Sequence, residues 1–380
     1  MPKRVLLMYI SYNSGHHRCS IAIEKALKML DPAVEVLNIN GFNYTNPILE
    51  RVINRTYMAV IKRKPQVWDY LYDNPKVFKK AQALRDFLHN MNFEKLQALL
   101  LDFKPDAVVC TQAFPCGMIA DLKSRNSFIK PPLFGVLTDY YPHSYWIYPA
   151  TDYFIVPSEQ SKEKLKQNGI PEEKIKIFGI PIDPRFNDRV DARLVKYSLG
   201  LDLDKPVVLV MGGGQGYGPI KDIVTELDGL ALDFQILVVA GINVRLFKWL
   251  NSSRRRFNKK TIALQFVDNV NELMEISSLI ITKPGGLTTA EALVKGLPMI
   301  IINPIPGQEA KNAQFLISIG AAEQTDDVPQ TGLKVAELLG NISKLKQMGI
   351  EAVKYSHPNS AIDLAKLILE ASGNAAVSSL

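Results

Sequence analysis

Two adjacent histidines follow the first apolar segment of the chain, and a histidine in this position can act as a general base. The segment covers residues 5–10, and His16 and His17 come shortly afterwards in the stretch Ser-Gly-His-His-Arg at 14–18. An imidazole has an unperturbed pKa of about 6.5, so near neutral pH it can take a proton from an incoming hydroxyl. A histidine that caps a helix or lies on the surface fits the same pattern, and position alone leaves both interpretations open.

Two glycine-containing loops in the second half of the chain have the composition of phosphate-binding loops. Residues 212–219 read Gly-Gly-Gly-Gln-Gly-Tyr-Gly-Pro, and residues 282–292 read Thr-Lys-Pro-Gly-Gly-Leu-Thr-Thr-Ala-Glu-Ala. Glycine lets backbone N–H groups approach an anion, and the N-terminus of a following helix favours negative charge. The first loop matches neither the Walker A spacing nor the dinucleotide-binding spacing. We therefore predict a diphosphate cradle, with a flexible turn as the alternative.

Polar side chains in and after these loops could bind the rest of a nucleotide sugar. Thr288 can hydrogen-bond a phosphate or cap a helix, and the carboxylate of Glu291 can hold a ribose diol. A further loop, Pro-Ile-Pro-Gly-Gln-Glu at 304–309, offers Gln308 and Glu309 as hydrogen-bond acceptors for sugar hydroxyls. Ordinary surface polarity is the alternative for these two residues.

Short apolar runs alternate with amphipathic stretches along most of the chain, a pattern typical of parallel sheets covered by helices. Expected strands lie at 5–10, 34–39, 107–110, 132–137 and 153–156, and then at 207–211, 234–240, 261–266, 279–281 and 299–302. Helices are expected at 20–30, over much of 47–101, from about 220 and at 361–371. The two series predict two doubly wound α/β domains, residues 1–186 and 187–380, and the final helix can pack on either.

Composition favours a two-domain globular protein. The chain has 380 residues, 47% of them hydrophobic, which exceeds what one ordinary core accommodates. No apolar run reaches the ~20 residues of a transmembrane helix, and the N-terminus lacks the apolar region of a signal peptide. Three scattered cysteines favour neither a disulfide framework nor a zinc site. We therefore expect a cytoplasmic protein.

The positive charge is concentrated in one segment. The net charge is +7, and residues 51–85 contain nine Lys and Arg against two Asp, which accounts for the whole excess. Aromatic residues interleave with these charges, as in segments that bind an anionic membrane, and no nucleic-acid recognition motif accompanies them. A solvated helix face is the alternative. The predicted membrane-contacting residues are Arg55, Lys62, Arg63, Lys64 and Trp68.

As a set, these motifs resemble glycosyltransferase family 28. The C-terminal similarity lies in Gly-Gly-Leu-Thr at 285–288 with Glu291, Gly-Leu-Pro at 296–298, and Pro-Gly-Gln-Glu at 306–309 with Asn312. The N-terminal half resembles the branch of monogalactosyldiacylglycerol synthases and processive diacylglycerol glucosyltransferases. That similarity rests on Gly15-His16, Thr138-Asp139, Trp146 and the stretch at 179–186.

This resemblance implies a GT-B fold, in which two Rossmann-like domains face a central cleft. It implies that the N-terminal domain binds the acceptor and docks on the membrane, while the C-terminal domain binds the UDP-sugar. The implied reaction is inverting transfer of glucose or galactose from a UDP-sugar to diacylglycerol, with no metal ion or other cofactor. The implied partners are the lipid acceptor and an anionic membrane surface rather than nucleic acid, and the implied location is the cytoplasmic membrane, as a peripheral protein.

The predicted site residues follow from the motifs and the resemblance together. His16 is the expected base, with the adjacent His17 as the alternative, and Asp139 is expected to orient the base or to line the acceptor site. His143 and Trp146 are expected at the acceptor site. The expected donor-binding residues are Gly213, Gly214, Gln215, Gly216, Asn243, Val267, Gly285, Gly286, Leu287, Thr288, Glu291, Gln308 and Glu309.

Other functions share these features. A GT-B N-acetylglucosaminyltransferase that acts on a polyprenyl-diphosphate-linked acceptor would use similar donor motifs, and a non-catalytic UDP-sugar-binding membrane protein would bind without turnover. A UDP-GlcNAc 2-epimerase needs paired active-site carboxylates, which the sequence does not identify. The Asp-Leu-Asp triplet at 202–204 has the form of a metal-binding motif, but it precedes an expected strand rather than following one. A metal-free reaction therefore remains the prediction.

Overall fold

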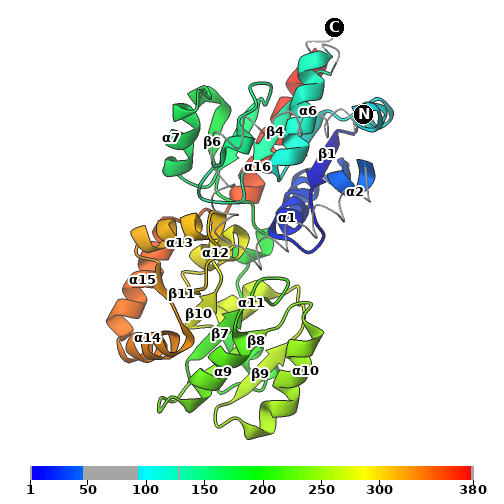
Figure 1. The fold of residues 1–380 in the computed structure, drawn as a ribbon. Helices are drawn as coiled ribbons and strands as arrows, with labels where there is room; N and C mark the ends of the chain where they lie inside the picture. Colours follow the sequence, from blue (N-terminus) through cyan, green and yellow to red (C-terminus); the bar gives the residue numbers. More distant parts are fainter. Residues whose placement is uncertain (1, 46–92, 127–128, 378–380) are drawn as a thin grey trace. The chain divides into compact units, whose positions relative to one another are not determined.

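The protein divides into two compact units (Figure 1). The computed structural model describes residues 2–45, 93–126 and 129–377. The first unit comprises Met1–Pro184, Ile305–Gln308 and Asn359–Leu380, and the second comprises Arg185–Pro304 and Glu309–Pro358. Each unit has its own sheet and its own core.

The first unit is built on a six-stranded parallel sheet with the order β2-β1-β3-β4-β5-β6. Its strands are β1 (Arg4–Tyr9), β2 (Glu35–Asn40), β3 (Ala107–Cys110), β4 (Leu133–Val136), β5 (Tyr153–Val156) and β6 (Ile175–Ile177). Strand β1 pairs with β2 on one side and with β3 on the other. The chain therefore changes direction across the sheet at β1, which creates a switch point beyond the carboxyl ends of β1 and β3, where α/β sheets bind ligands.

Helices cover both faces of this sheet. They are α1 (Gly15–Leu30), α2 (Gly41–Thr45), α6 (Ala113–Arg125), α7 (Glu159–Gln167) and α16 (Ser360–Val377), with the short 3₁₀ helix η1 (Ser144–Trp146). Along β1, Val5 and Leu7 pack in the cluster formed with α1 and α16, whereas Leu6 and Met8 pack in the cluster that contains α6. Successive residues of a strand point to opposite faces, so α1 and α16 cover one face and α6 covers the other.

The second unit repeats this architecture with the sheet order β12-β11-β10-β7-β8-β9. Its strands are β7 (Val207–Met211), β8 (Gln235–Val239), β9 (Thr261–Leu264), β10 (Leu279–Thr282), β11 (Met299–Ile302) and β12 (Ala322–Thr325). Strand β7 pairs in parallel with both β8 and β10. The switch point of this sheet therefore lies beyond the carboxyl ends of β7 and β10, the strands that precede the two glycine-containing loops.

Helices surround the sheet of the second unit, and most of them pack on the apolar residues of its strands. They are α8 (Ala192–Ser198), α9 (Ile220–Gly229), α10 (Val244–Ser253), α11 (Val270–Glu275), α12 (Gly286–Val294), α13 (Gln308–Ser318), α14 (Val328–Gly340) and α15 (Ile342–Lys354), with the 3₁₀ helix η4 (Arg254–Arg256). Val208 and Val210 of β7 share a core cluster with Ile223 of α9 and Val335 of α14. Within the described part of the chain, no helix has the length and apolar character needed to cross a membrane.

The predicted α/β class, with two parallel sheets, is confirmed. Two edge strands, β6 and β12, were not predicted, because each is short and carries polar residues. Helix α1 begins at Gly15 rather than at the predicted residue 20, since the Ser14 side chain caps it by accepting a hydrogen bond from the His17 N–H. Most of the helical stretch predicted at 47–101 lies outside the described residues, and its end at 93–101 is helical.

Candidate active site

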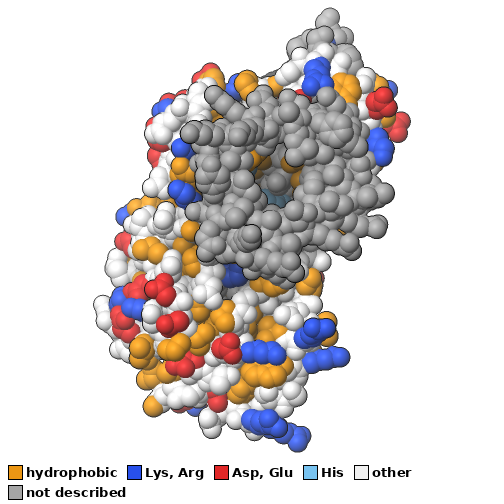
Figure 2. All heavy atoms as spheres, in the orientation of Figure 1, with side chains coloured by type: hydrophobic (Ala, Val, Ile, Leu, Met, Phe, Trp, Pro, Cys, Tyr) orange, Lys and Arg blue, Asp and Glu red, His pale blue; other side chains and the backbone are white. Residues whose placement is uncertain are grey.

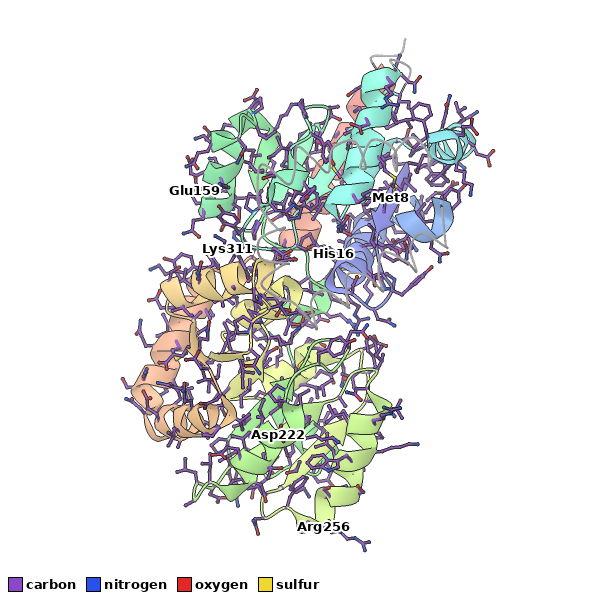
Figure 3. The ribbon with its side chains drawn as sticks, in the orientation of Figure 1. Met8, His16, Glu159, Asp222, Arg256 and Lys311 are labelled. Carbon is purple, nitrogen blue, oxygen red and sulfur yellow. The ribbon has the colours of Figure 1, made fainter. Side chains whose placement is uncertain are left out.

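His16 and His17 lie in the first turn of α1, at the switch point of the first sheet, and His16 is labelled in Figure 3. The connection from β1 contains Ser11, with φ of 65°, and Asn13, with φ of 57°. Positive φ is uncommon for residues other than glycine, and such strained conformations are concentrated at functional sites. This tight connection places both histidines directly beyond the end of β1.

The His16 ring is held by two residues that are distant in sequence. Its Nδ1 lies 2.8 Å from the backbone carbonyl oxygen of Thr111 and 2.9 Å from Oγ1 of Thr138. Thr111 follows β3, and its own Oγ1 donates a hydrogen bond of 3.0 Å to the His16 carbonyl oxygen. Both the backbone and the ring of His16 are therefore fixed against the end of the neighbouring strand.

These contacts determine which ring nitrogen of His16 can accept a proton. A carbonyl oxygen only accepts hydrogen bonds, so the short contact with Thr111 requires a hydrogen on Nδ1. In the neutral ring Nε2 then carries the lone pair. The geometry therefore assigns the basic site of His16 to Nε2.

The surroundings of His16 keep the ring neutral at neutral pH. Burial lowers the pKa of His16, while the carboxylate of Asp139 and the hydrogen bond to the Thr111 carbonyl oppose this effect. The pKa remains below its usual value, so the ring is in the form that a general base requires. The charge of Asp139 favours the imidazolium form of His16.

His17 has a different environment. Its Nδ1 accepts a 3.3 Å hydrogen bond from the backbone N–H of Asn13, and its ring stacks on Tyr9 with the centroids 4.3 Å apart. The ring also meets the edge of Tyr12, at 5.6 Å between centroids. The pKa of His17 is lowered by burial and by the charge of Arg18, and no carboxylate among the described residues opposes them. His17 therefore supports the strand-to-helix connection, whereas His16 has the environment of a base.

Three further predicted residues lie in or after the loop that follows β4. Asp139 comes immediately after Thr138, and within the first unit its carboxylate accepts a hydrogen bond from the side-chain amide of Gln308. A predicted catalytic residue and a predicted donor residue are thus brought together. His143 precedes η1, and Trp146 closes it, 5% exposed and packed in the core that contains α6. The burial of Trp146 favours a structural role in this loop.

The glycine loop after β7 is tied to the loop after β8. A Cβ at Gly216, which has φ of 62°, would lie 2.1 Å from the carbonyl oxygen of Ala240. The Asn243 side-chain amide donates a 3.2 Å hydrogen bond to the Gly216 carbonyl, and the backbone N–H of Ile242 donates one of 3.0 Å to Gly214. Asn243 also caps α10, so it holds the predicted cradle against a second strand end. By contrast, a Cβ at Gly213 would have no described atom within 4 Å.

The second glycine loop forms an open helix N-terminus. Gly285 is the N-cap of α12, and no side chain caps this end. A Cβ at Gly285 would find no described atom within 4 Å. The loop is nevertheless fixed, because buried Asn312 donates a 3.0 Å hydrogen bond to the Pro284 carbonyl and the Thr289 hydroxyl donates to Gly285 and Gly286. This end of α12 can present its N–H groups to an anion.

A lysine that was not among the predicted site residues lies beside this loop. The Nζ of Lys283, directly after β10, is 2.8 Å from Oε1 of Glu309, in the first turn of α13. The two side chains are only 18% and 16% exposed. The sequence feature that could have identified Lys283 is its position as a cation between the end of a strand and a Gly-Gly pair. The ion pair fixes the carboxylate that was predicted to meet a sugar hydroxyl.

The remaining predicted donor residues lie at the same ends of the second sheet's strands. Gln215 belongs to the loop after β7, Val267 follows β9, and Leu287, Thr288 and Glu291 lie in the first turns of α12. The predicted membrane contacts Arg55, Lys62, Arg63, Lys64 and Trp68 lie outside the described residues. Among the residues that are described, no three His, Cys, Asp or Glu side chains form a group that could hold a metal ion.

Two family models match successive halves of the chain. The model for monogalactosyldiacylglycerol (MGDG) synthase matches residues 16–182, and the model for the glycosyltransferase family 28 C-terminal domain matches residues 207–368. The processive diacylglycerol beta-glucosyltransferase of Bacillus cytotoxicus is 28% identical over 369 residues, which cover 97% of this chain and 93% of that protein. Its counterpart in Bacillus subtilis is 29% identical over 350 residues, covering 91% and 89%.

Solved structures share the fold across nearly the whole chain. MurG of Acinetobacter baumannii superposes with a TM-score of 0.62 at 17% identity, covering 97% of this chain and all of that one (100%). The UDP-GlcNAc 2-epimerase of Neisseria meningitidis, solved with UDP-GlcNAc, gives 0.60 at 14% identity, with 97% and 100% coverage. At these identities the similarity establishes the two-domain GT-B fold alone.

Proposed function

Because the chain is a glycosyltransferase that belongs to family 28, in the branch of the monogalactosyldiacylglycerol synthases, we propose that it transfers a hexose from a UDP-sugar to diacylglycerol. The observation that carries this proposal is the environment of His16. Its Nδ1 is committed to the Thr111 carbonyl, so Nε2 is the basic nitrogen, at the point of the first sheet where ligands bind. An enzyme that activates a hydroxyl needs a base of this kind.

The second unit binds the donor. Backbone N–H groups of the loop at 212–219 and of the N-terminus of α12 meet the diphosphate, where the helix dipole favours negative charge. Glu291 holds the ribose, and Glu309, oriented by Lys283, accepts a hydrogen bond from a hexose hydroxyl. Gln308, which belongs to the first unit, offers a further acceptor for the hexose. The surroundings of Gly285 support this arrangement, because no described atom lies within 4 Å of the position that a Cβ would take there, which leaves the backbone accessible to an anion from the described part of the chain.

The first unit performs the chemistry on the acceptor. Nε2 of His16 takes the proton of the diacylglycerol hydroxyl as that oxygen attacks the anomeric carbon of the hexose. The bond from the anomeric carbon to the UDP oxygen breaks on the opposite face, so the configuration inverts. Asp139 stabilises the imidazolium of His16, and the N-terminus of α12 stabilises the charge that develops on the leaving diphosphate. No step of this proposed reaction requires a metal ion.

The acceptor is taken from a membrane. The curated relatives are named diacylglycerol glucosyltransferases, which supports diacylglycerol as acceptor and glucose as the first sugar to test, with galactose as the alternative. The basic and aromatic segment at 51–85 supports contact with an anionic bilayer. The first unit, formed mainly by residues 1–184, docks there and the second unit supplies the donor, so the enzyme acts as a peripheral protein of the cytoplasmic membrane.

A transfer assay tests this proposal. The purified protein is incubated with anionic vesicles that contain diacylglycerol and with UDP-glucose, UDP-galactose or UDP-GlcNAc, with and without EDTA, and lipids are read by mass spectrometry. The expected product is a monohexosyl-diacylglycerol from one hexose donor, insensitive to EDTA, and its further extension would show processive addition. Measurable UDP binding with no lipid product from any donor would contradict diacylglycerol as the acceptor. Activity only with UDP-GlcNAc and a polyprenyl diphosphate acceptor would overturn the proposal in favour of another reaction.

A further inference from the structure

The second half of the chain has no net charge, but its basic and acidic residues are distributed unevenly along the sequence. Residues 186–380 contain 20 Lys and Arg and 20 Asp and Glu. The stretch 234–267, however, contains seven Lys and Arg and no acidic residue. The rest of this half therefore holds 13 basic and 20 acidic residues. A surface that gathers the positive charge of an otherwise acidic unit indicates an anionic partner.

The structure places most of this charge on one strip of the second unit, formed by α10 and η4. Helix α10 buries Leu246 and Leu250, and its opposite face carries exposed Arg245 and Lys248. Three consecutive exposed residues, Arg254–Arg256, continue the strip. None of these five cations forms an ion pair with a residue that the structure describes. We refer to Arg245, Lys248 and Arg254–Arg256 as the α10 strip.

The figures show the same arrangement. Lys and Arg side chains gather over the region where α10 and β9 lie, whereas acidic and basic side chains are mixed over α14 and α15 (Figures 1 and 2). Arg256 points away from the ribbon (Figure 3). Helix α10 packs on β9, one edge of the sheet, whereas α15 packs on α14, which lies against β11 and β12 at the other edge, so the α10 strip and α15 belong to opposite ends of this unit.

Aromatic residues lie beside the strip. Trp249 of α10 meets the edge of Phe257, with ring centroids 6.1 Å apart, and the Nζ of Lys221 lies 5.2 Å from the centroid of the Trp249 ring. Both rings are partly exposed, and Val244, at the start of α10, is 51% exposed. A helix that combines cations on its solvent face with a partly exposed tryptophan has the composition of interfacial helices, in which the ring lies at headgroup depth.

We propose that the α10 strip is a second membrane-contacting surface, on the donor-binding unit, and that it binds the phosphate headgroups of anionic lipids. From Arg245 to Arg256 the strip extends along about eleven residues, or roughly 16 Å at the helical rise, which is enough to contact several headgroups. Each basic residue at such a surface strengthens binding about fivefold. This contact is separate from the segment at 51–85, and it depends on neither the hexose nor the acceptor of the proposed reaction.

Vesicle binding by the full-length protein tests this inference. The test variant is Arg255→Glu/Arg256→Glu, and the matched control is Lys346→Glu/Lys354→Glu on α15, which changes the net charge equally at the opposite end of the unit. Lys354 is 62% exposed, with a 3.5 Å contact to Glu351 and its Nζ 5.3 Å from the centroid of the Tyr355 ring, so the control disturbs only surface contacts. Partitioning onto phosphatidylcholine vesicles with and without phosphatidylglycerol is measured by co-sedimentation, without UDP-sugar, at several salt concentrations.

The expected result is a loss of about 20–30-fold or more in partitioning of the strip variant onto anionic vesicles, with a smaller salt dependence. The control should change less than about threefold, and neither variant should change UDP affinity. Equal losses in both variants, or none in the strip variant, would overturn the inference. A strip variant that binds anionic vesicles normally but loses binding to RNA would assign the strip to nucleic acid instead. Because no turnover is measured, failure here is distinct from failure of the proposed reaction.

Discussion

Replacing His16 and His17 in turn distinguishes the roles of the two adjacent histidines, which have the same side chain but different environments. In His16→Ala the ring that bonds to Thr111 at 2.8 Å and approaches Thr138 at 2.9 Å is lost. The free energy of unfolding should fall by about 1–2 kcal/mol, which corresponds to the loss of one or two hydrogen bonds. The expected loss of catalysis is larger, because removing a general base lowers kcat by about 10²–10⁴-fold, which corresponds to roughly 3–5 kcal/mol of transition-state stabilisation.

The variant His17→Ala is the matched control. It removes the ring stacked on Tyr9 at 4.3 Å but keeps the backbone N–H that Ser14 caps. Its expected loss of stability is about 0.5–1.5 kcal/mol, similar to that of His16→Ala. If His16 alone is the base, kcat of the His17 variant should stay within about threefold of the wild type.

The assay is steady-state transfer to diacylglycerol in vesicles with varied UDP-sugar, alongside urea unfolding of both variants. His16→Ala should lower kcat with little change in KM for the donor, because the donor is bound by the other unit. Comparable losses of kcat in the two variants, or full turnover by His16→Ala, would refute the assignment of Nε2 of His16 as the base.

Three further predictions follow from the sites. Asp139→Asn should lower the pKa of His16 further, since this carboxylate raises it, so the acid limb of kcat/KM should move to lower pH while kcat falls; an unmoved acid limb would show that Asp139 does not act through His16. Gly216→Ala should lower the free energy of unfolding in urea by about 3–5 kcal/mol, because its Cβ would lie 2.1 Å from a backbone oxygen. Gly213→Ala should lower it by only about 1–2 kcal/mol, because φ is also positive there but no described atom lies within 4 Å of the new Cβ. Equal losses of stability in the two variants would mean that the loop does not pack as described. Lys283→Met should raise KM for the UDP-hexose about tenfold and leave the Kd of UDP within twofold, because the lysine orients a carboxylate on α13 rather than the diphosphate; a tenfold loss of UDP affinity would instead make it a diphosphate ligand.

Much of the fold could be predicted from the sequence because buried parallel strands appear as continuous apolar runs. Strands β1, β7 and β11 are such runs, fully enclosed in their sheets. Strand β12 reads Ala-Glu-Gln-Thr and was not predicted, since an edge strand can carry polar residues. Its extended conformation depends on pairing with β11, which its own sequence does not indicate.

The candidate site could be predicted only in part. The sequence located the neighbourhood of the base, because two histidines followed a strand, but it could not choose between them. That choice depends on Thr111 and Thr138, which are 95 and 122 residues from His16 and meet it only when β1, β3 and β4 lie side by side. The ion pair of Lys283 was missed for the same reason, since its partner Glu309 follows a different strand.

The most direct test of the central claim is the anomeric configuration of the lipid product. The purified enzyme is supplied with the α-linked UDP-hexose that it accepts and with diacylglycerol in vesicles, and the first monohexosyl-diacylglycerol is isolated and read by the proton NMR coupling at the anomeric carbon. A single displacement by an acceptor oxygen that His16 deprotonates predicts a β-linked product, which should be nearly absent with His16→Ala. An α-linked product, or a β-linked product formed at the wild-type rate without His16, would contradict the account.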